Sequence, residues 1–302
     1  MRNSTFSALL VSFLALMVSG LAQSGDDKKD DDSELRPSGK GWGEKDNNAA
    51  GGKSRGTSGI SYHGGPVMLG QTNVYYIWYG NWSGNTAAQS ILNYFAYNIG
   101  GSPYFNINTT YFDGSGKHVS NLVTLGGATS DNYSEGASLS DAAILSVVSK
   151  AIAKSGVADP NGVYFVLTSA DVTATSGFCT QYCGWHDHAT IGGKDVKYSF
   201  VGNPDRCPSS CAAQTIGPNG NAGADAMASI IAHELEESVT DPDLNAWYDS
   251  RGQENGDKCA WTFGTVSTAR NGSKYNMTLG TANYLIQQNW LNVGAGSCAL
   301  KY

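Results

Sequence analysis

A short run of residues near the end of a predicted helix has the side chains and the spacing to bind a metal ion. The sequence His-Glu-Leu-Glu-Glu occupies residues 233–237, in the C-terminal half of a segment, 224–239, whose apolar residues recur with helical spacing. Because an α-helix has 3.6 residues per turn, His233 and Glu237 project from one face and can converge on one ion. Glu234 is displaced by about 100° and can reach a water molecule held by that ion.

This spacing is that of the H-E-x-x-H zinc helix with Glu237 in place of the second histidine. Zinc binds carboxylate oxygen as well as imidazole nitrogen, so the run predicts a metal site with Glu234 as the general base. A solvated acidic helix end is the alternative. Acidic side chains near a helix C-terminus are unfavourable against the helix dipole, however, and Asp241 and Asp243 follow closely. We therefore predict zinc, with calcium as the alternative because the carboxylates suit calcium better than the histidine does.

A catalytic zinc site has three protein ligands and one open position for water. The third ligand must come from outside the helix, and Glu254 is the first candidate, followed by Asp257 in the same polar loop. Cys259 comes two residues later and can fix this loop through a disulfide. We therefore predict that the loop lies against the end of the helix and supplies the third ligand.

Two further sources of a third ligand stay open. Asp241 is nearer to Glu237 in the sequence, but Pro242 ends the helix there, so the direction of its side chain is not set by the helical repeat. His186 and His188 share one side if their segment is extended. Histidines in a surface loop are the commoner explanation for that pair.

Other kinds of chemistry are poorly supported. The sequence has no G-x-S-x-G nucleophile motif, no phosphate-binding loop and no dinucleotide-binding fingerprint. Its formal net charge of -7 argues against nucleic acid as a partner.

Helical and strand-like patterns alternate along the chain. Helices are predicted at 87–99, from 141 to about 155, and at 224–239, and strands at 73–79, 163–167 and 198–201. After Trp261 the sequence favours short β segments. We predict a single mixed α/β domain, with a zincin-like helix at its active site.

The six cysteines all lie in the C-terminal half of the chain: Cys179, Cys183, Cys207, Cys211, Cys259 and Cys298. An even number behind a secretion signal predicts disulfides, although six cysteines allow 15 pairings. A four-thiolate zinc site made by the two C-x3-C pairs is the weaker alternative, because thiolates oxidise outside the cell. The C-terminal half should therefore be stabilised by disulfides.

The N-terminus has the three parts of a secretory signal peptide. Arg2 precedes an apolar run, 6–18, that is too short to span a bilayer, and small residues end at Ala22. We predict a signal peptide at 1–22, a disordered charged linker at 23–58 and a folded domain at 59–302. The mature protein should be secreted, with no membrane span. Its Asn-x-Ser/Thr sequons are at Asn81, Asn108, Asn132, Asn271 and Asn276.

Several short runs, in a fixed order, resemble the EXORDIUM or phosphate-induced protein 1 family. They cover residues 62–67, 74–80, 178–184, 201–204 and 207–212, together with Cys298. The resemblance extends over roughly residues 60–302. It implies an apoplastic or cell-wall protein linked to growth, without an established catalytic activity. The sequence departs from the plant pattern at 233–237, where plant members carry small and apolar residues.

Two functions follow from these observations. In the first, the protein is a secreted metal-dependent peptidase or hydrolase in which His233, Glu237 and Glu254 hold zinc and Glu234 takes a proton from the bound water. In the second, it is a non-catalytic growth-related or cell-wall-binding protein whose acidic helix holds a structural ion or none. The expected partner is an extracellular protein, a peptide or a cell-wall component.

Overall fold

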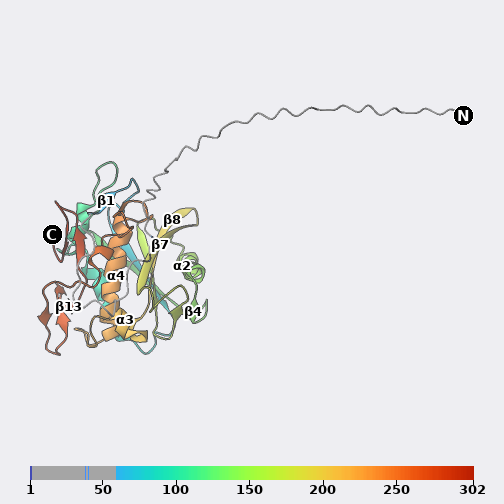
Figure 1. The fold of residues 1–302 in the computed structure, drawn as a ribbon. Helices are drawn as coiled ribbons and strands as arrows, with labels where there is room; N and C mark the ends of the chain where they lie inside the picture. The colour runs from blue at the N-terminus through green and yellow to red at the C-terminus, as the bar shows by residue number, and fades with distance from the viewer. Residues whose placement is uncertain (2–37, 39, 41–58) are drawn as a thin grey trace, which may run out of the picture. The chain divides into compact units, whose positions relative to one another are not determined.

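The computed structural model describes Met1, Ser38, Lys40 and residues 59–302 (Figure 1). Except for those first three positions, the predicted signal peptide and the predicted linker lie outside the described residues. Among the helices that are described, none has both the length and the apolar character required to cross a bilayer.

A five-stranded sheet forms the centre of the fold, in the order β3-β2-β5-β8-β7. Strands β2 (Thr72–Tyr79), β3 (Val123–Asp131), β5 (Gly162–Thr168) and β8 (Lys194–Val201) are parallel to one another. Strand β7 (Gly184–Ile191) pairs antiparallel with β8 and forms one edge of the sheet. The predicted strands at 73–79, 163–167 and 198–201 are thus confirmed. Neither edge strand, β3 or β7, was predicted.

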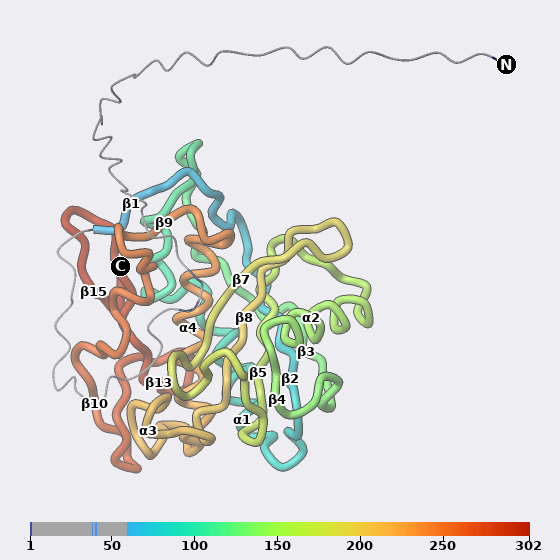
Figure 2. The backbone as a smooth tube through the Cα atoms, turned by 45° about the vertical axis from the view of Figure 1, so that its right-hand side comes forward, coloured from blue at the N-terminus to red at the C-terminus, as the bar shows by residue number. Residues whose placement is uncertain are grey.

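Helices cover both faces of this sheet. Helix α1 (Thr86–Asn98) connects β2 to β3, and α2 (Asp141–Ser155) leads back past β2 to β5. Parallel crossovers are right-handed, so two connections that run in opposite directions place their helices on opposite faces. Helix α4 (Ala222–Thr240) packs against α1, β7 and β8, on the face opposite α2 (Figures 1 and 2). The mixed α/β prediction is confirmed.

The ends of α1 and α2 are capped by residues directly beside them. Asn85 caps α1 by accepting a hydrogen bond from the backbone N–H of Ala88, and Ser140 caps α2 in the same way. Gly156 ends α2 in the left-handed conformation, at a φ of 72° that glycine adopts without strain. The three predicted helices are confirmed, and their ends lie within two residues of the predicted positions.

Helix α4 is buried on every side. Each residue from Met227 to Thr240 is buried, including all three glutamates. The predicted apolar stripe is confirmed, since Met227, Ile230, Ile231 and Leu235 belong to the core. The alternative of a solvated acidic helix end is wrong, because α4 lies between the sheet and the C-terminal part of the chain.

Short strands and turns make up the rest of the described chain. Strand β9 (Trp247–Tyr248) pairs with β1 (Ser61–Tyr62) directly after α4. The other short elements are β4 (Ser138–Leu139), β6 (Thr173–Ala174), α3 (Pro208–Cys211), β10 (Ser267–Thr268), β11 (Lys274–Tyr275), β12 (Met277–Leu279), β13 (Ala282–Tyr284), β14 (Asn289–Leu291), β15 (Ser297–Ala299), and the 3-10 turns η1 (Phe105–Thr110), η2 (Pro204–Arg206) and η3 (Asp257–Cys259). The short β segments predicted after Trp261 are confirmed.

All six cysteines are paired. The disulfides are Cys179–Cys207, Cys183–Cys211 and Cys259–Cys298. The first two join the segment before β7 to the segment around α3. The two C-x3-C pairs are therefore cross-linked to each other, and the four-thiolate zinc alternative is wrong.

One predicted glycosylation site is incompatible with the fold. The side chain of Asn108 is fully buried, and its Oδ1 accepts hydrogen bonds from the amides of Asn255 and Asn289, at 3.2 and 2.8 Å. A glycan on this side chain would have to occupy the core.

Candidate metal centre

The C-terminal half of α4 presents three acidic or basic side chains toward β7 and the loop that follows α4. His233, Glu234 and Glu237 are 5%, 3% and 1% exposed. Helix α4 is fixed at its N-terminus by Asn221, whose side chain accepts a hydrogen bond from the N–H of Ala224. The helical repeat then determines which faces carry the three side chains.

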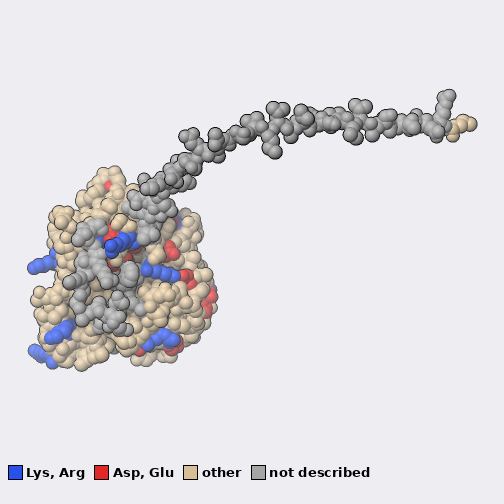
Figure 3. Space-filling model, in the orientation of Figure 1, with Lys and Arg blue, Asp and Glu red and all other residues tan. Residues whose placement is uncertain are grey.

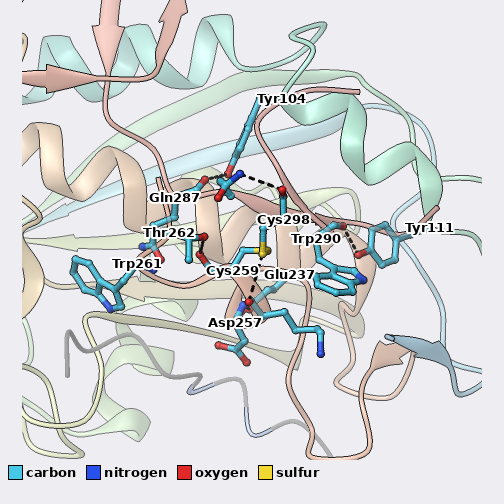
Figure 4. Close-up of a disulfide and its surroundings, with 12 residues drawn as sticks. Tyr104, Tyr111, Glu237, Asp257, Cys259, Trp261, Thr262, Gln287, Trp290 and Cys298 are labelled. Atoms are coloured by element: carbon cyan, nitrogen blue, oxygen red, sulfur yellow. Dashed lines mark hydrogen bonds between the residues drawn. A yellow bond between two sulfur atoms is a disulfide. The ribbon is translucent and has the colours of Figure 1, made fainter. Parts of the chain in front are cut away.

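The first group of convergent side chains consists of His233, Glu237 and Asp257, here called the His233 trio. His233 Nε2 lies 3.1 Å from Glu237 Oε1 and 3.5 Å from Asp257 Oδ1. The backbone N–H of Asp257 donates a hydrogen bond to Glu237 Oε1 at 3.0 Å (Figure 4). The loop that carries Asp257 therefore lies directly against the helix, as the sequence predicted.

Two local features allow this close approach. A Cβ atom on Gly256 would lie 3.0 Å from both Glu237 Oε1 and the His233 ring, so a larger residue would force the loop away from the helix. The Cys259–Cys298 disulfide holds the other end of the 3-10 turn that begins at Asp257 (Figure 4). Together they fix the position of Asp257 relative to α4.

The second group shares Glu237 and adds one residue from the sheet. It consists of His186, Glu237 and Glu254, here called the His186 trio. His186 Nε2 lies 3.2 Å from both carboxylate oxygens of Glu254 and 3.7 Å from Glu237 Oε2. His186 is on β7, so the antiparallel edge strand supplies the second histidine of the site.

Glu234 belongs to neither trio and lies against the start of β7. A Cβ atom on Gly184 would be 2.8 Å from Glu234 Oε1 and 2.6 Å from Ile230 Cγ2, so glycine leaves room for this carboxylate. Within the described part of the chain, Glu234 Oε2 is buried without a hydrogen-bond partner. The carboxylate interacts electrostatically with His233 and Glu254 but belongs to neither trio.

The histidine–carboxylate separations within the trios are close to those of a zinc ligand shell. Donor atoms about 2.0–2.1 Å from a tetrahedral zinc are about 3.3 Å from each other. The measured nitrogen–oxygen separations of 3.1, 3.2, 3.5 and 3.7 Å lie on either side of that value. The donor set of imidazole and carboxylate is one that zinc accepts.

Burial controls the protonation of these groups. It raises the pKa of Glu237 to about 7, and it raises the pKa values of Glu234 and Glu254 well above their ordinary range. Burial lowers the pKa of His186 to about 3. It also acts to lower the pKa of His233, but the neighbouring carboxylates outweigh it and raise that pKa well above its usual value. A divalent cation would favour the ionised form of each carboxylate.

The structure separates the candidates for the third ligand. Asp257 lies in the trio of His233, whereas the first candidate, Glu254, lies in the trio of His186. Asp241 belongs to neither trio. Its Oδ1 accepts hydrogen bonds from the backbone N–H groups of residues 245 and 246 at 2.6 Å. It closes the turn after α4.

His188 is directed to a different cluster on the same strand. Its Nδ1 lies 3.0 Å from Asp195 Oδ1 and 3.6 Å from Asp243 Oδ1. Lys197 pairs with both carboxylates, at 3.0 Å to Asp243. The ammonium group already supplies the positive charge there, and His188 itself is 38% exposed. His186 and His188 therefore do not act as a pair.

Comparisons with known proteins identify the family. The conserved region of phosphate-induced protein 1 matches residues 60–298. The chain belongs to this family. Residues 60–298 include both trios, Glu234 and all six cysteines.

Relatives from two plants are similar to this family member over most of their length. EXORDIUM-like 5 of Arabidopsis thaliana is 33% identical over 274 residues, which cover 76% of this chain and 75% of the relative. EXORDIUM-like 3 of the same plant is 32% identical over 275 residues, covering 78% and 81%. PHOSPHATE-INDUCED 1 of Nicotiana tabacum is 28% identical over 218 residues, covering 63% and 67%. No solved structure matches the chain significantly.

Proposed function

We propose that this protein is an extracellular member of the EXORDIUM family that uses zinc to hydrolyse a peptide or a related bond. The observation that carries the proposal is the buried His233 trio with the carboxylate of Glu234 beside it. Three protein ligands, with room for water as the fourth, are the composition of a catalytic zinc site. Asp257 takes the place of the third ligand because it is the loop carboxylate grouped with His233.

The side chains have separate tasks in this proposal. Bound zinc would lower the pKa of its water to ~7 and polarise the scissile carbonyl. His233, Glu237 and Asp257 would hold the ion, and the Cys259–Cys298 disulfide keeps the loop of Asp257 in place. Glu234 accepts the proton of the attacking water and passes it to the leaving group, as a general base and then a general acid.

The N-terminal sequence and the cysteines support a location outside the cell. A signal peptide at 1–22 would send the chain to an oxidising compartment, where disulfides persist. The three disulfides support this, since the described chain has no free cysteine. The partner in this setting is an extracellular protein, a peptide or a cell-wall component.

A non-catalytic role is the second candidate, and the burial of the site favours it. Structural metal sites are closed, whereas catalytic sites keep an accessible position. His233, Glu237 and Asp257 are 5%, 1% and 7% exposed. A structural ion at this position would stabilise the fold of a growth-related or cell-wall-binding protein without any reaction.

Two measurements distinguish these functions. The first is the zinc content of the purified protein by elemental analysis, and the second is cleavage of a broad peptide library with and without a chelator. Zinc-dependent cleavage supports the enzyme. Bound zinc without cleavage, together with a lower melting temperature after chelation, supports the structural role. A metal-free protein that is folded and inert would end both metal proposals and leave the family assignment alone.

A further inference from the structure

Glu237 lies between two histidines and presents a different oxygen to each. Its Oε1 is 3.1 Å from His233 Nε2, and its Oε2 is 3.7 Å from His186 Nε2. The two histidines come from different elements, since His233 is on α4 and His186 is on β7. The carboxylate therefore occupies the position of a bridge between two ligand sets.

We propose that the site holds two divalent cations that share Glu237. The first ion is bound by the His233 trio and the second by the His186 trio. This inference rests on the proposed metal site and extends it from one ion to two. Paired ions about 3.5–4 Å apart are common in hydrolases, where they stabilise the attacking and the leaving atoms together.

The number of ligands favours two ions. The trios contain five side chains, which is more than the three protein ligands of a catalytic zinc site or the four of a structural one. Divided between two ions, they provide one histidine, one terminal carboxylate and one oxygen of Glu237 to each. Each ion then has three protein ligands.

Formal charge also favours more than one ion. The carboxylates of the two trios, Glu237, Glu254 and Asp257, carry three negative charges when ionised. A single divalent cation would not balance them, and an uncompensated charge in a buried site is energetically unfavourable.

An independent observation comes from hydrogen bonding. In the described part of the chain, Glu237 Oε2 and Glu234 Oε2 are buried and accept no hydrogen bond. A buried acceptor without a partner destabilises a fold. Glu237 Oε2 is the oxygen directed toward His186, where the second ion would bind. Glu237 Oε2 is therefore available to bind the second ion.

The donor types indicate which ions fit. Each ion would have one imidazole and two carboxylates, a set that suits zinc and manganese better than the softer metals that prefer thiolates. Manganese is paramagnetic, so it also reports on the distance between two ions through their magnetic coupling.

The test is a metal titration of the full chain after removal of metal with a chelator. Zinc added to this protein should bind with a stoichiometry of about two. Glu254→Gln, a nearly isosteric change in the His186 trio, should reduce the stoichiometry to about one and leave the affinity of the other ion within about tenfold. His186→Ala should act in the same way. With manganese, the electron paramagnetic resonance spectrum should show a coupled pair in the parent and isolated ions in Glu254→Gln.

The matched control is Glu236→Gln, on the same helix and equally buried but outside both trios. It should keep both ions and the coupled spectrum. One bound ion in the parent, with the same stoichiometry in Glu254→Gln, would overturn the second site while leaving the proposed function in place. No bound ion in a folded parent would overturn both. Circular dichroism of each variant establishes that it is folded, and if His186→Ala is not, Glu254→Gln decides the outcome.

Discussion

Replacing Glu234 with glutamine separates metal binding from proton transfer. The side chain is 3% exposed and belongs to neither trio, so the ligands of the metal stay unchanged. Glutamine has nearly the same shape, which matters because a Cβ on Gly184 would be only 2.8 Å from Glu234 Oε1. It cannot accept the proton of the bound water. We therefore expect bound zinc to be retained and hydrolysis to be lost.

The size of the effect follows from the role of the carboxylate. General-base catalysis typically contributes ~10²–10⁴-fold, which corresponds to about 3–5 kcal/mol of transition-state stabilisation. The free energy of unfolding should change by about 1 kcal/mol or less, because Glu234 Oε2 accepts no hydrogen bond that the amide would lose. The assay compares kcat/KM for a peptide identified by library screening, zinc content and thermal unfolding. His233→Ala should lose both zinc and activity.

Glu236→Gln is the control for this experiment. Glu236 is 1% exposed and belongs to neither trio. It follows Glu234 by two residues, so it projects about 200° away around the helix. Its carboxylate lies near Tyr104 and Tyr111, whose pKa values it helps to raise after the larger effect of burial. Full activity in Glu234→Gln, with zinc retained, would refute the general-base role.

Three further predictions concern the fold and its processing. Replacing both Cys259 and Cys298 with serine should reduce the free energy of unfolding by about 4 kcal/mol, because their disulfide joins residues 39 apart. Chemical denaturation measures this change, and an unchanged midpoint would contradict the prediction. Burial raises the pKa of Asp225 to about 6, so its protonated form contributes stability below pH ~4 that is lost as the pH rises through about 6. The difference in the free energy of unfolding between pH 4 and pH 7 should therefore be smaller in Asp225→Asn, by at most about 3 kcal/mol. Equal pH profiles of stability for parent and variant would refute this. The secreted protein should begin near Gln23, and N-terminal sequencing that finds the initiator methionine would rule out the signal peptide.

The helices of this fold could be predicted from the sequence because residues close to their ends determine where they begin and stop. The start and end of α2 are determined by Ser140 and Gly156, which act within one turn of the helix. The two edge strands were missed for a different reason. Strand β3 contains adjacent glycines and has several exposed residues, and β7 contains a polar His-Asp-His run. An edge strand is held by one neighbouring strand only, so its own sequence carries a weaker signal than a strand buried on both sides.

The candidate site shows the same division between local and tertiary information. The spacing of His233 and Glu237 is a property of one helix and was readable from the sequence. The position of His186 depends on the order of the sheet, which places the edge strand β7 beside α4. The choice between Glu254 and Asp257 depends on the short 3-10 turn that begins at Asp257.

The glutamate at position 237 changes what the zinc-type helix can do. A histidine at that position would offer a metal one nitrogen lone pair, with the second nitrogen on the other side of the ring. A carboxylate has two oxygens, and in this fold Oε1 faces His233 whereas Oε2 faces His186. A histidine would leave His186 and Glu254 as a buried pair without a third ligand. The departure from H-E-x-x-H that weakens the motif in the sequence therefore lets one side chain of α4 face both histidines, and it is the reason to expect a shared site at this helix.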